Sequence, residues 1–243
     1  MKAIGNIYLT WRKGKGHSRI IVGVIKRNKT NGVRFKYIND EGNDNDDLNN
    51  SGLNIKKTKQ KYSQIGVSKA LKEGFTYYTD FPDLTKEYSE NVLEILGKRL
   101  TNSDRADIQK YYDFWEVNPS FKDDKYYLLA HTQGLLATDN YEFLADYHPL
   151  KGLSFISEIC GLSYNNIASD FIEIGEELRW ELDTKNSFDS NAVRVFKGKT
   201  YLGNVKLVHC NVFHKTGGDK LKIRVKSLEK NGHLNRVFIK ISF

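Results

Sequence analysis

Six short runs in the carboxy-terminal part of the chain are rich in β-branched and aromatic residues, and several alternate between apolar and polar side chains. Gly, Asn, Asp and Lys separate them, as is typical of turns between strands. The runs are residues 153–164, 176–183, 192–196, 201–206, 221–228 and 236–243. Residues 209–215 fit a short helix. Many short strands with one small helix predict a compact barrel or sandwich.

The amino-terminal part begins with a second group of strand-like runs. Residues 3–9, 19–26 and 32–38 are rich in β-branched and aromatic side chains, and Gly, Lys and Asn separate them. This pattern predicts a small β meander at the start of the chain.

Helical spacing follows the meander. Apolar residues recur every three or four positions in segments 68–73, 86–100, 104–115 and 122–134. Pro149 and Gly152 then interrupt this rhythm before the last group of strands. We therefore expect an α+β protein with two domains, residues 1–150 and 151–243.

The net charge of +8 is unevenly distributed. Residues 1–39 carry ten Lys or Arg and no acid, residues 40–184 carry 15 basic and 27 acidic residues, and residues 185–243 carry 13 basic and three acidic residues. Two basic ends flank an acidic middle. This predicts either a nucleic-acid footprint at one or both ends, or docking of the ends onto the protein's own acidic centre. A solvated lysine-rich surface is the third interpretation.

The sequence does not indicate a membrane or an oxidising compartment. No stretch approaches about 18 consecutive apolar residues, and the first residues lack the apolar block of a signal peptide. Cys160 and Cys210 are expected to be free, since two scattered cysteines in a reducing compartment seldom form a disulfide. We expect a cytoplasmic protein that does not bind membranes.

Catalytic and metal-binding patterns are weak. The glycine-containing stretches 14–18 and 216–220 do not match a phosphate-binding P-loop. His209, Cys210 and His214 lack a second pair of ligands at metal-binding spacing. We therefore expect no enzymatic activity, no metal and no cofactor.

Three motifs follow one another in the last part of the chain. They are ICGLSYNN (159–166), IGEELRWELDTKNSFDSNAVRVF (174–196) and YLGNVK (201–206). Their order and spacing resemble the HIRAN domain, in which a G-x-x-Y element is followed by a strand, a polar N-x-[FY]-D-x-N-A turn and a Gly-centred strand. The most specific matches are Asn186, Phe188, Asp189, Asn191, Ala192 and Gly203.

This resemblance implies a modified OB-type β-barrel that binds DNA, in particular the 3′-hydroxyl end of a single strand. By position, Tyr164 is similar to the family's aromatic residue that meets the strand end, and Asp189 would accept a hydrogen bond from the terminal hydroxyl. Phe188 would stack on a base, and Lys206 would contact the backbone. The implied DNA-binding set is Tyr164, Asn186, Phe188, Asp189, Asn191 and Lys206.

The chemistry of these residues agrees with such a site. Only an acceptor such as Asp189 can read a hydroxyl donor, and it would repel a 3′-phosphate. Aromatic faces at Tyr164 and Phe188 would add about 1–3 kcal/mol of stacking per base, and the basic segment 185–243 would make binding fall with salt. The same residue types also suit a structural role, in which Asp189 and Asn191 build a turn and Phe188 lies in the core.

The amino-terminal half carries a weaker resemblance. Residues 7–38, GFTYYTDFPDL (74–84) and ILGKRL (95–100) resemble the amino-terminal part of bacterial HIRAN-containing proteins and the small β subdomain at the start of HipA-type kinases. In such toxin systems a separate small protein can restrain the kinase. The chain has no Gly-rich loop followed by the Lys and catalytic Asp that a kinase needs.

Two functions from different classes follow. The first is a non-catalytic protein that binds single-stranded DNA and its 3′-hydroxyl ends and positions a nuclease, helicase or repressor partner there. The second is an antitoxin-like subunit that restrains a HipA-type serine/threonine kinase, with the β meander of residues 1–38 as its docking surface. DNA binding is the leading prediction.

Overall fold

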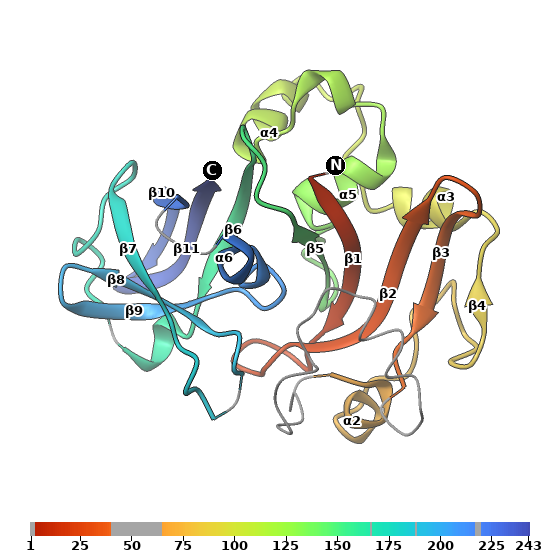
Figure 1. The fold of residues 1–243 in the computed structure, drawn as a ribbon, viewed down its shortest axis with the longest axis horizontal. Coiled ribbons are helices and arrows are strands. Elements are labelled where there is room, and N and C mark those ends of the chain that lie inside the picture. Colours follow the sequence, from red (N-terminus) through yellow and green to blue (C-terminus); the bar gives the residue numbers. More distant parts are fainter. Residues whose placement is uncertain (1–2, 40–64, 166, 188, 217–219) are drawn as a thin grey trace. The chain divides into compact units, whose positions relative to one another are not determined.

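The computed structural model describes residues 3–39, 65–165, 167–187, 189–216 and 220–243 (Figure 1). The chain divides into two compact units. We call Lys2–Ile108 with Asn118–Asp146 the sheet unit, and Gln109–Val117 with Tyr147–Phe243 the barrel unit. This division differs from the predicted domains, 1–150 and 151–243, because a helical segment from the first predicted domain belongs to the barrel unit.

Five strands form the sheet of the sheet unit, and Figure 1 shows the first three in red and orange. They are β1 (Ile4–Trp11), β2 (Ile20–Asn28), β3 (Gly32–Tyr37), β4 (Glu87–Tyr88) and β5 (Tyr141–Tyr147), in the order β4-β3-β2-β1-β5. The first four pair antiparallel with their neighbours. Ile25 lies opposite both Ile7 and Phe35, and all three are fully buried.

Strand β5 is an element that the sequence did not predict. Residues 142–147 are all buried, so they lack the in-and-out alternation by which a half-exposed strand is recognised. The buried carboxylate of Glu142 accepts two hydrogen bonds from the Arg19 guanidinium, each 2.8 Å long. Burial of this charge is tolerated because it is paired.

Among its described residues, the sheet unit contains the α-helices α2 (Val67–Lys72), α3 (Val92–Gly97) and α5 (Lys125–Thr132). A short 3₁₀-helix, η2 (Pro119–Phe121), precedes α5. Asp124 caps α5, since its Oδ1 accepts hydrogen bonds from the backbone N–H groups of Tyr126 and Tyr127 at 2.9 and 3.1 Å. An acidic cap at this point agrees with the helix predicted over 122–134.

The continuous helix predicted over 86–100 is wrong in its first part. Glu87 and Tyr88 form β4, because Tyr88 pairs with Phe35 of β3. The chain then passes through Asn91, whose φ of 53° is left-handed, and α3 starts only at the next residue. A pairing between residues far apart in the sequence has overridden the local helical spacing.

Six strands close the barrel of the barrel unit. They are β6 (Ser154–Cys160), β7 (Glu177–Leu182), β8 (Val193–Lys197), β9 (Thr200–Val205), β10 (Lys222–Asn231) and β11 (His233–Ser242). The order around the barrel is β10-β11-β6-β9-β8-β7, and pairing of β10 with β7 closes it. The strand pairs are antiparallel. The protein thus mixes helices and sheets and contains a closed barrel consistent with an OB-like architecture.

The helical segment of the barrel unit is α4 (Ile108–Phe114), apart from its first residue. Just beyond it, the Glu116 carboxylate accepts hydrogen bonds from the ammonium groups of Lys226 and Lys240, at 2.8 and 2.7 Å. Aromatic side chains at the end of the helix pack on Phe238. These contacts explain why the segment belongs to the barrel rather than to the unit that precedes it in the sequence.

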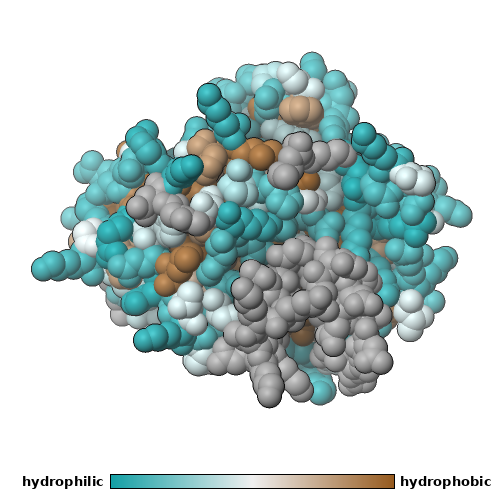
Figure 2. Space-filling model, viewed as in Figure 1, coloured by the Kyte–Doolittle hydropathy of each residue, from teal (hydrophilic) through white to brown (hydrophobic). Residues whose placement is uncertain are grey.

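The surface of the protein is mainly hydrophilic on the face that Figure 2 shows, and hydrophobic side chains gather there in small groups. Among the described residues, Tyr164 is the most exposed large hydrophobic side chain, at 84%. Cys160 and Cys210 are free thiols. None of the helices that the structure describes has the length and apolar character needed to cross a bilayer.

Candidate nucleic-acid interface

The connection between β7 and β8 is an ordered polar turn. Its ends are joined by the backbone hydrogen bond from Asp183 N to Ala192 O, 2.8 Å long. Inside it, Asn186 Oδ1 accepts from Asp189 N at 3.1 Å, and Asp189 Oδ1 accepts from Asn191 N at 2.8 Å. Asn186, Asp189 and Asn191 therefore build the turn that the structural interpretation of the motif predicts. Phe188, also assigned to DNA, lies outside the described residues.

Asp189 is also partly buried in this turn. Burial raises the pKa of its carboxyl group, while the N–H of Asn191 and the charge of His214 oppose the rise. His214, on helix α6 (Asn211–Thr216), donates from Nε2 to the Asn191 carbonyl oxygen at 3.0 Å. The turn therefore rests on α6, and the Asp189 carboxylate still has lone pairs for a further donor after its bond to Asn191.

Tyr164 belongs to a different element, the 3₁₀-helix η3 (Leu162–Tyr164), which follows β6 directly. Gly161 starts η3 with a φ of 86°, a conformation that favours glycine. Asn165 Nδ2 donates to the Leu202 carbonyl oxygen of β9 at 3.2 Å, which ties the end of η3 to the barrel. Tyr164 is thus an exposed aromatic ring on an anchored backbone.

Strand β9 borders both elements. Its residue Leu202 accepts the bond from Asn165. The adjacent residue, Tyr201, lies close enough to Asp183 of the polar turn for that charge to act on the Tyr201 pKa. The principal cause of the raised Tyr201 pKa is burial, and the charge of Arg194 opposes it. The sequence-predicted residues on η3 and in the turn are therefore connected through one strand.

Gly203 permits the close approach of β9 to β6. A Cβ atom at this position would lie 2.3 Å from the carbonyl oxygen of Cys160 and 2.8 Å from Cγ2 of Ile159. Its φ of 153° is also unfavourable for other residues. The packing of β9 against β6 therefore explains the glycine of the YLGNVK motif without any ligand.

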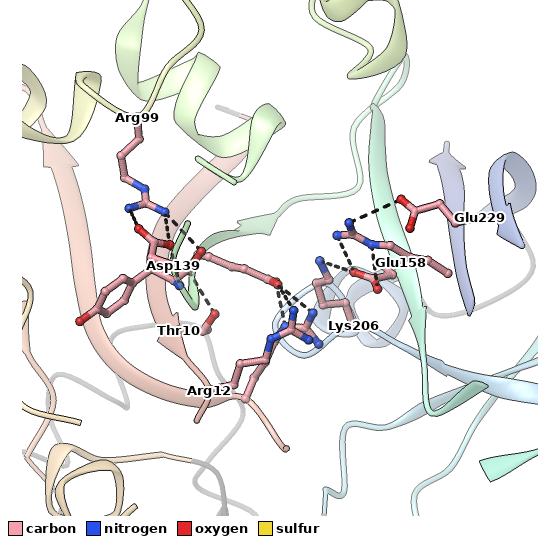
Figure 3. Close-up of polar contacts among 11 residues, drawn as sticks. Thr10, Arg12, Arg99, Asp139, Glu158, Lys206 and Glu229 are labelled. Carbon is pink, nitrogen blue, oxygen red and sulfur yellow. Dashed lines mark hydrogen bonds and ion pairs between the residues drawn. The ribbon is translucent and has the colours of Figure 1, made fainter. Parts of the chain in front are cut away.

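Lys206 is buried, whereas its predicted contact with DNA requires a position on the surface. Its side chain is 0% exposed, and Nζ lies 3.0 Å from the Glu158 carboxylate. The same carboxylate also pairs with Arg236, which reaches Glu229 as well (Figure 3). In this arrangement the ammonium group of Lys206 cannot reach a DNA phosphate. It instead takes part in the ion-pair network of the barrel.

The sequence reasoning did not single out Arg194, on the outer face of β8. The Arg194 Cζ lies 4.8 Å from the ring centre of Tyr201 and 5.0 Å from that of Phe196. Arg179 of β7 covers Phe196 as well, at 4.3 Å, and pairs with Glu181. The V-R-V alternation around Arg194 was the available signal, since it places Val193 and Val195 inside and the arginine outside.

The arginines of the amino-terminal strands are paired within the sheet unit. Arg19 binds Glu142 at 2.8 Å, Arg27 binds Asp124 at 2.7 Å, and Arg34 binds Glu87 at 2.8 Å. In the same unit the Arg99 guanidinium binds Asp139 through two hydrogen bonds (Figure 3). The acids that bind Arg19, Arg27 and Arg34 come from the acidic middle of the sequence, which agrees with docking of the basic amino-terminal end onto the protein's own acidic centre.

Metal-binding side chains do not converge. Within the described parts of the chain there is no group of three or more His, Cys, Asp and Glu residues that could hold a metal ion. His209 Nδ1 lies 2.9 Å from Ser157 Oγ, and Cys210 Sγ lies 3.2 Å from the carbonyl oxygen of Val205. Burial raises the Cys210 pKa well above its ordinary value. These side chains have structural partners inside the barrel.

Comparisons with known proteins give one match to report. No protein-family model and no curated protein matches the chain. Among solved structures, the HIRAN domain of human HLTF matches with 17% sequence identity, covering 36% of this chain and 74% of that chain, with a TM-score of 0.29. A TM-score this low carries no argument about function.

Proposed function

We propose that this protein binds single-stranded DNA without catalysis and that the barrel unit holds the 3′-hydroxyl end of the strand. The observation that carries the proposal is the exposure of Tyr164, 84% on a backbone anchored to β9. A large aromatic ring left in water on an ordered element offers a face on which a base can stack, worth about 1–3 kcal/mol.

Asp189 would read the end of the strand. Asn191 N–H occupies one position on its Oδ1, and the turn fixes the carboxylate in place before any ligand arrives. A terminal hydroxyl is a donor and would form a charge-assisted hydrogen bond with the carboxylate. A terminal phosphate would meet like charge at the same position, so the two ends should be distinguished.

The charge of the carboxy-terminal segment supports a polyanionic ligand. Residues 185–243 carry 13 basic and three acidic residues. Basic side chains that neutralise phosphates release bound counterions, so affinity should fall as salt rises. The carboxylate of Asp189 supplies end discrimination, whereas the basic surface supplies affinity that does not depend on the end.

The test is fluorescence polarisation with labelled oligonucleotides that end in a 3′-hydroxyl or a 3′-phosphate. Asp189→Asn is the central variant, because an amide oxygen can still accept the Asn191 N–H and keep the turn. Asp170→Asn, an exposed acid of the same unit, is the matched control. Tyr164→Ala should weaken binding roughly tenfold, and Tyr77→Ala, 45% exposed in the sheet unit, should not.

The outcomes separate three possibilities. Preference for the hydroxyl end that Asp189→Asn removes and Asp170→Asn retains would support end recognition. Binding that ignores the 3′ group would reduce the protein to a basic surface. Absence of binding to any oligonucleotide would overturn the proposal. Restraint of a HipA-type kinase stays a prediction, since neither the fold nor the comparisons bear on it.

A further inference from the structure

Arg194 differs from every other arginine of the protein. The structure describes all ten arginines, and the other nine each form an ion pair with a carboxylate. Within the described chain, Arg194 has neither a carboxylate at ion-pair distance nor a hydrogen-bond acceptor for its guanidinium; its recorded contacts are with aromatic rings. A guanidinium is charged at every physiological pH, so this is a standing, uncompensated positive charge.

Two aromatic rings lie against the guanidinium of Arg194. Its Cζ lies 4.8 Å from the centre of the Tyr201 ring and 5.0 Å from that of the Phe196 ring, and the two ring centres are 5.6 Å apart. Stacking on aromatic faces leaves the N–H donors at the edge of the group available for two parallel hydrogen bonds. Phosphate oxygens suit this fork, and little side-chain freedom remains to be lost on binding.

The position of Arg194 connects it to the proposed DNA site. In the barrel, Cys160 of β6 lies opposite Asn204 of β9, and Asn204 lies opposite Arg194 of β8. Two strand spacings, about 10 Å, therefore separate Arg194 from the end of β6, after which η3 and Tyr164 follow. Along the chain, Arg194 is five residues from Asp189, which limits their separation to roughly 18 Å. One short oligonucleotide can span these points.

We infer that Arg194 binds a backbone phosphate of the DNA strand on the inner side of its terminal nucleotide, and that Tyr201 and Phe196 position the guanidinium for this contact. The inference rests on the proposed function and extends it. The outer face of β8 and β9 thus binds the DNA on the inner side of its terminal nucleotide, next to the turn that contacts the 3′ end. Lys206, whose ammonium group is buried against Glu158, takes no part in the contact.

The experiment is a phosphate scan with 3′-hydroxyl oligonucleotides. Each of the phosphodiesters nearest the end is replaced in turn by a neutral methylphosphonate, and binding is measured for wild type, Arg194→Gln and Arg194→Lys. Arg179→Gln is the matched control, because it removes one arginine that covers the same Phe196 ring but is paired with Glu181. Thermal unfolding of each variant checks that the barrel is folded.

Neutralising one particular phosphate should have an effect on affinity that depends on the presence of Arg194. Its neutralisation should weaken wild-type binding roughly tenfold and weaken Arg194→Gln binding less than about twofold. Arg194→Gln should also lower the salt dependence by about one counterion. Arg194→Lys should fall between wild type and Gln, because it keeps the charge and loses the fork. Arg179→Gln should respond to the neutral phosphates as wild type does.

Two results would overturn the inference. If the hydroxyl preference is intact but no phosphate is coupled to Arg194, this contact is wrong while the proposed function survives. If no oligonucleotide binds the wild type, the proposed function fails and the inference fails with it.

Discussion

The two units handle their positive charge differently. In the sheet unit every arginine has a carboxylate partner, and four of these pairs join the basic amino-terminal segment to acids from the middle of the chain. In the barrel unit three arginines are also paired, but Arg194 rests on two aromatic rings. Net charge along the sequence therefore does not identify a binding surface. Arg194 has no carboxylate partner among the described residues, so it is the arginine that we expect to gain a phosphate partner on binding DNA.

Gly203 of the barrel unit and Gly23 of the sheet unit each lie close to a neighbouring strand. Replacing them by alanine is expected to lower the free energy of unfolding by different amounts. Gly203→Ala should destabilise the barrel by about 4 kcal/mol or more, since the new Cβ would lie 2.3 Å from a backbone oxygen at an unfavourable φ. Gly23→Ala in the sheet unit should cost about 2 kcal/mol, because its nearest neighbour, 2.5 Å away, is the edge of the Phe35 ring.

Denaturant unfolding followed by tryptophan fluorescence measures both effects. Trp11 reports on the sheet unit, and Trp115 and Trp180 report on the barrel unit. Gly198→Ala is the control, since it has a left-handed φ of 56° but no neighbour within 4 Å, and it should cost about 1 kcal/mol. Equal losses for the Gly203 and Gly198 variants would show that crowding at the β6–β9 contact does not matter.

Removing a paired, buried cation should destabilise either unit without affecting DNA affinity of the folded protein. Lys206→Met in the barrel and Arg99→Met in the sheet should each lower the free energy of unfolding by about 3 kcal/mol, because each leaves a carboxylate without one of its partners. The salt dependence of oligonucleotide binding should not change. A reduced salt dependence in a stable Lys206→Met protein would return Lys206 to the DNA-binding set.

Asp189 is expected to make recognition of the 3′ end depend on pH. Discrimination between 3′-hydroxyl and 3′-phosphate ends, expected to be roughly tenfold, should disappear as the pH falls through the raised Asp189 pKa, because the neutral carboxyl group no longer repels phosphate. Asp189→Asn should show little discrimination at any pH. A wild-type profile that is flat over this range would exclude Asp189 as the end reader.

The raised Asp189 pKa also determines the direction in which the stability of the folded protein changes with pH. The folded state disfavours the charged carboxylate, so the stability linked to Asp189 is fully present below its ordinary pKa and is lost as the pH rises through the raised value. Asp189→Asn should therefore be at least as stable as wild type at pH 7. A clear loss of stability at pH 7 would show that the negative charge itself holds the turn.

The smallest expected effect concerns a paired cation near the surface. Arg34 and Glu87 form an exposed ion pair, so Arg34→Gln should change stability by less than about 1 kcal/mol and leave oligonucleotide binding unchanged. Arg194→Gln should have a similarly small effect on stability but should weaken binding. If both variants weakened binding equally, pairing status would not distinguish the two surfaces.

Local patterns predicted much of this structure. Alternation marked the strands of the barrel, Asp124 and the spacing after it marked α5, and the polar motif of residues 186–192 marked a turn. Each of these depends on contacts within a few residues, namely cap hydrogen bonds, Asx hydrogen bonds and the two faces of a strand. The resemblance of the motifs around Tyr164 and Asp189 to the HIRAN domain was the reason for proposing them as parts of one site.

Only the tertiary structure decided the remaining features. Strand β5 is buried throughout and so has no alternation to read, and pairing with β3 turned part of a helical pattern into β4. Arg194 lies in β8 and Lys206 directly follows β9, each beside apolar neighbours, yet the folded barrel buries Lys206 against Glu158 and leaves Arg194 on aromatic rings. The sequence by itself determined which residues carry charge and which strands can form. Which charges are neutralised depends on partners far away in the chain, because electrostatic pairing requires proximity in space and only the folded chain supplies it.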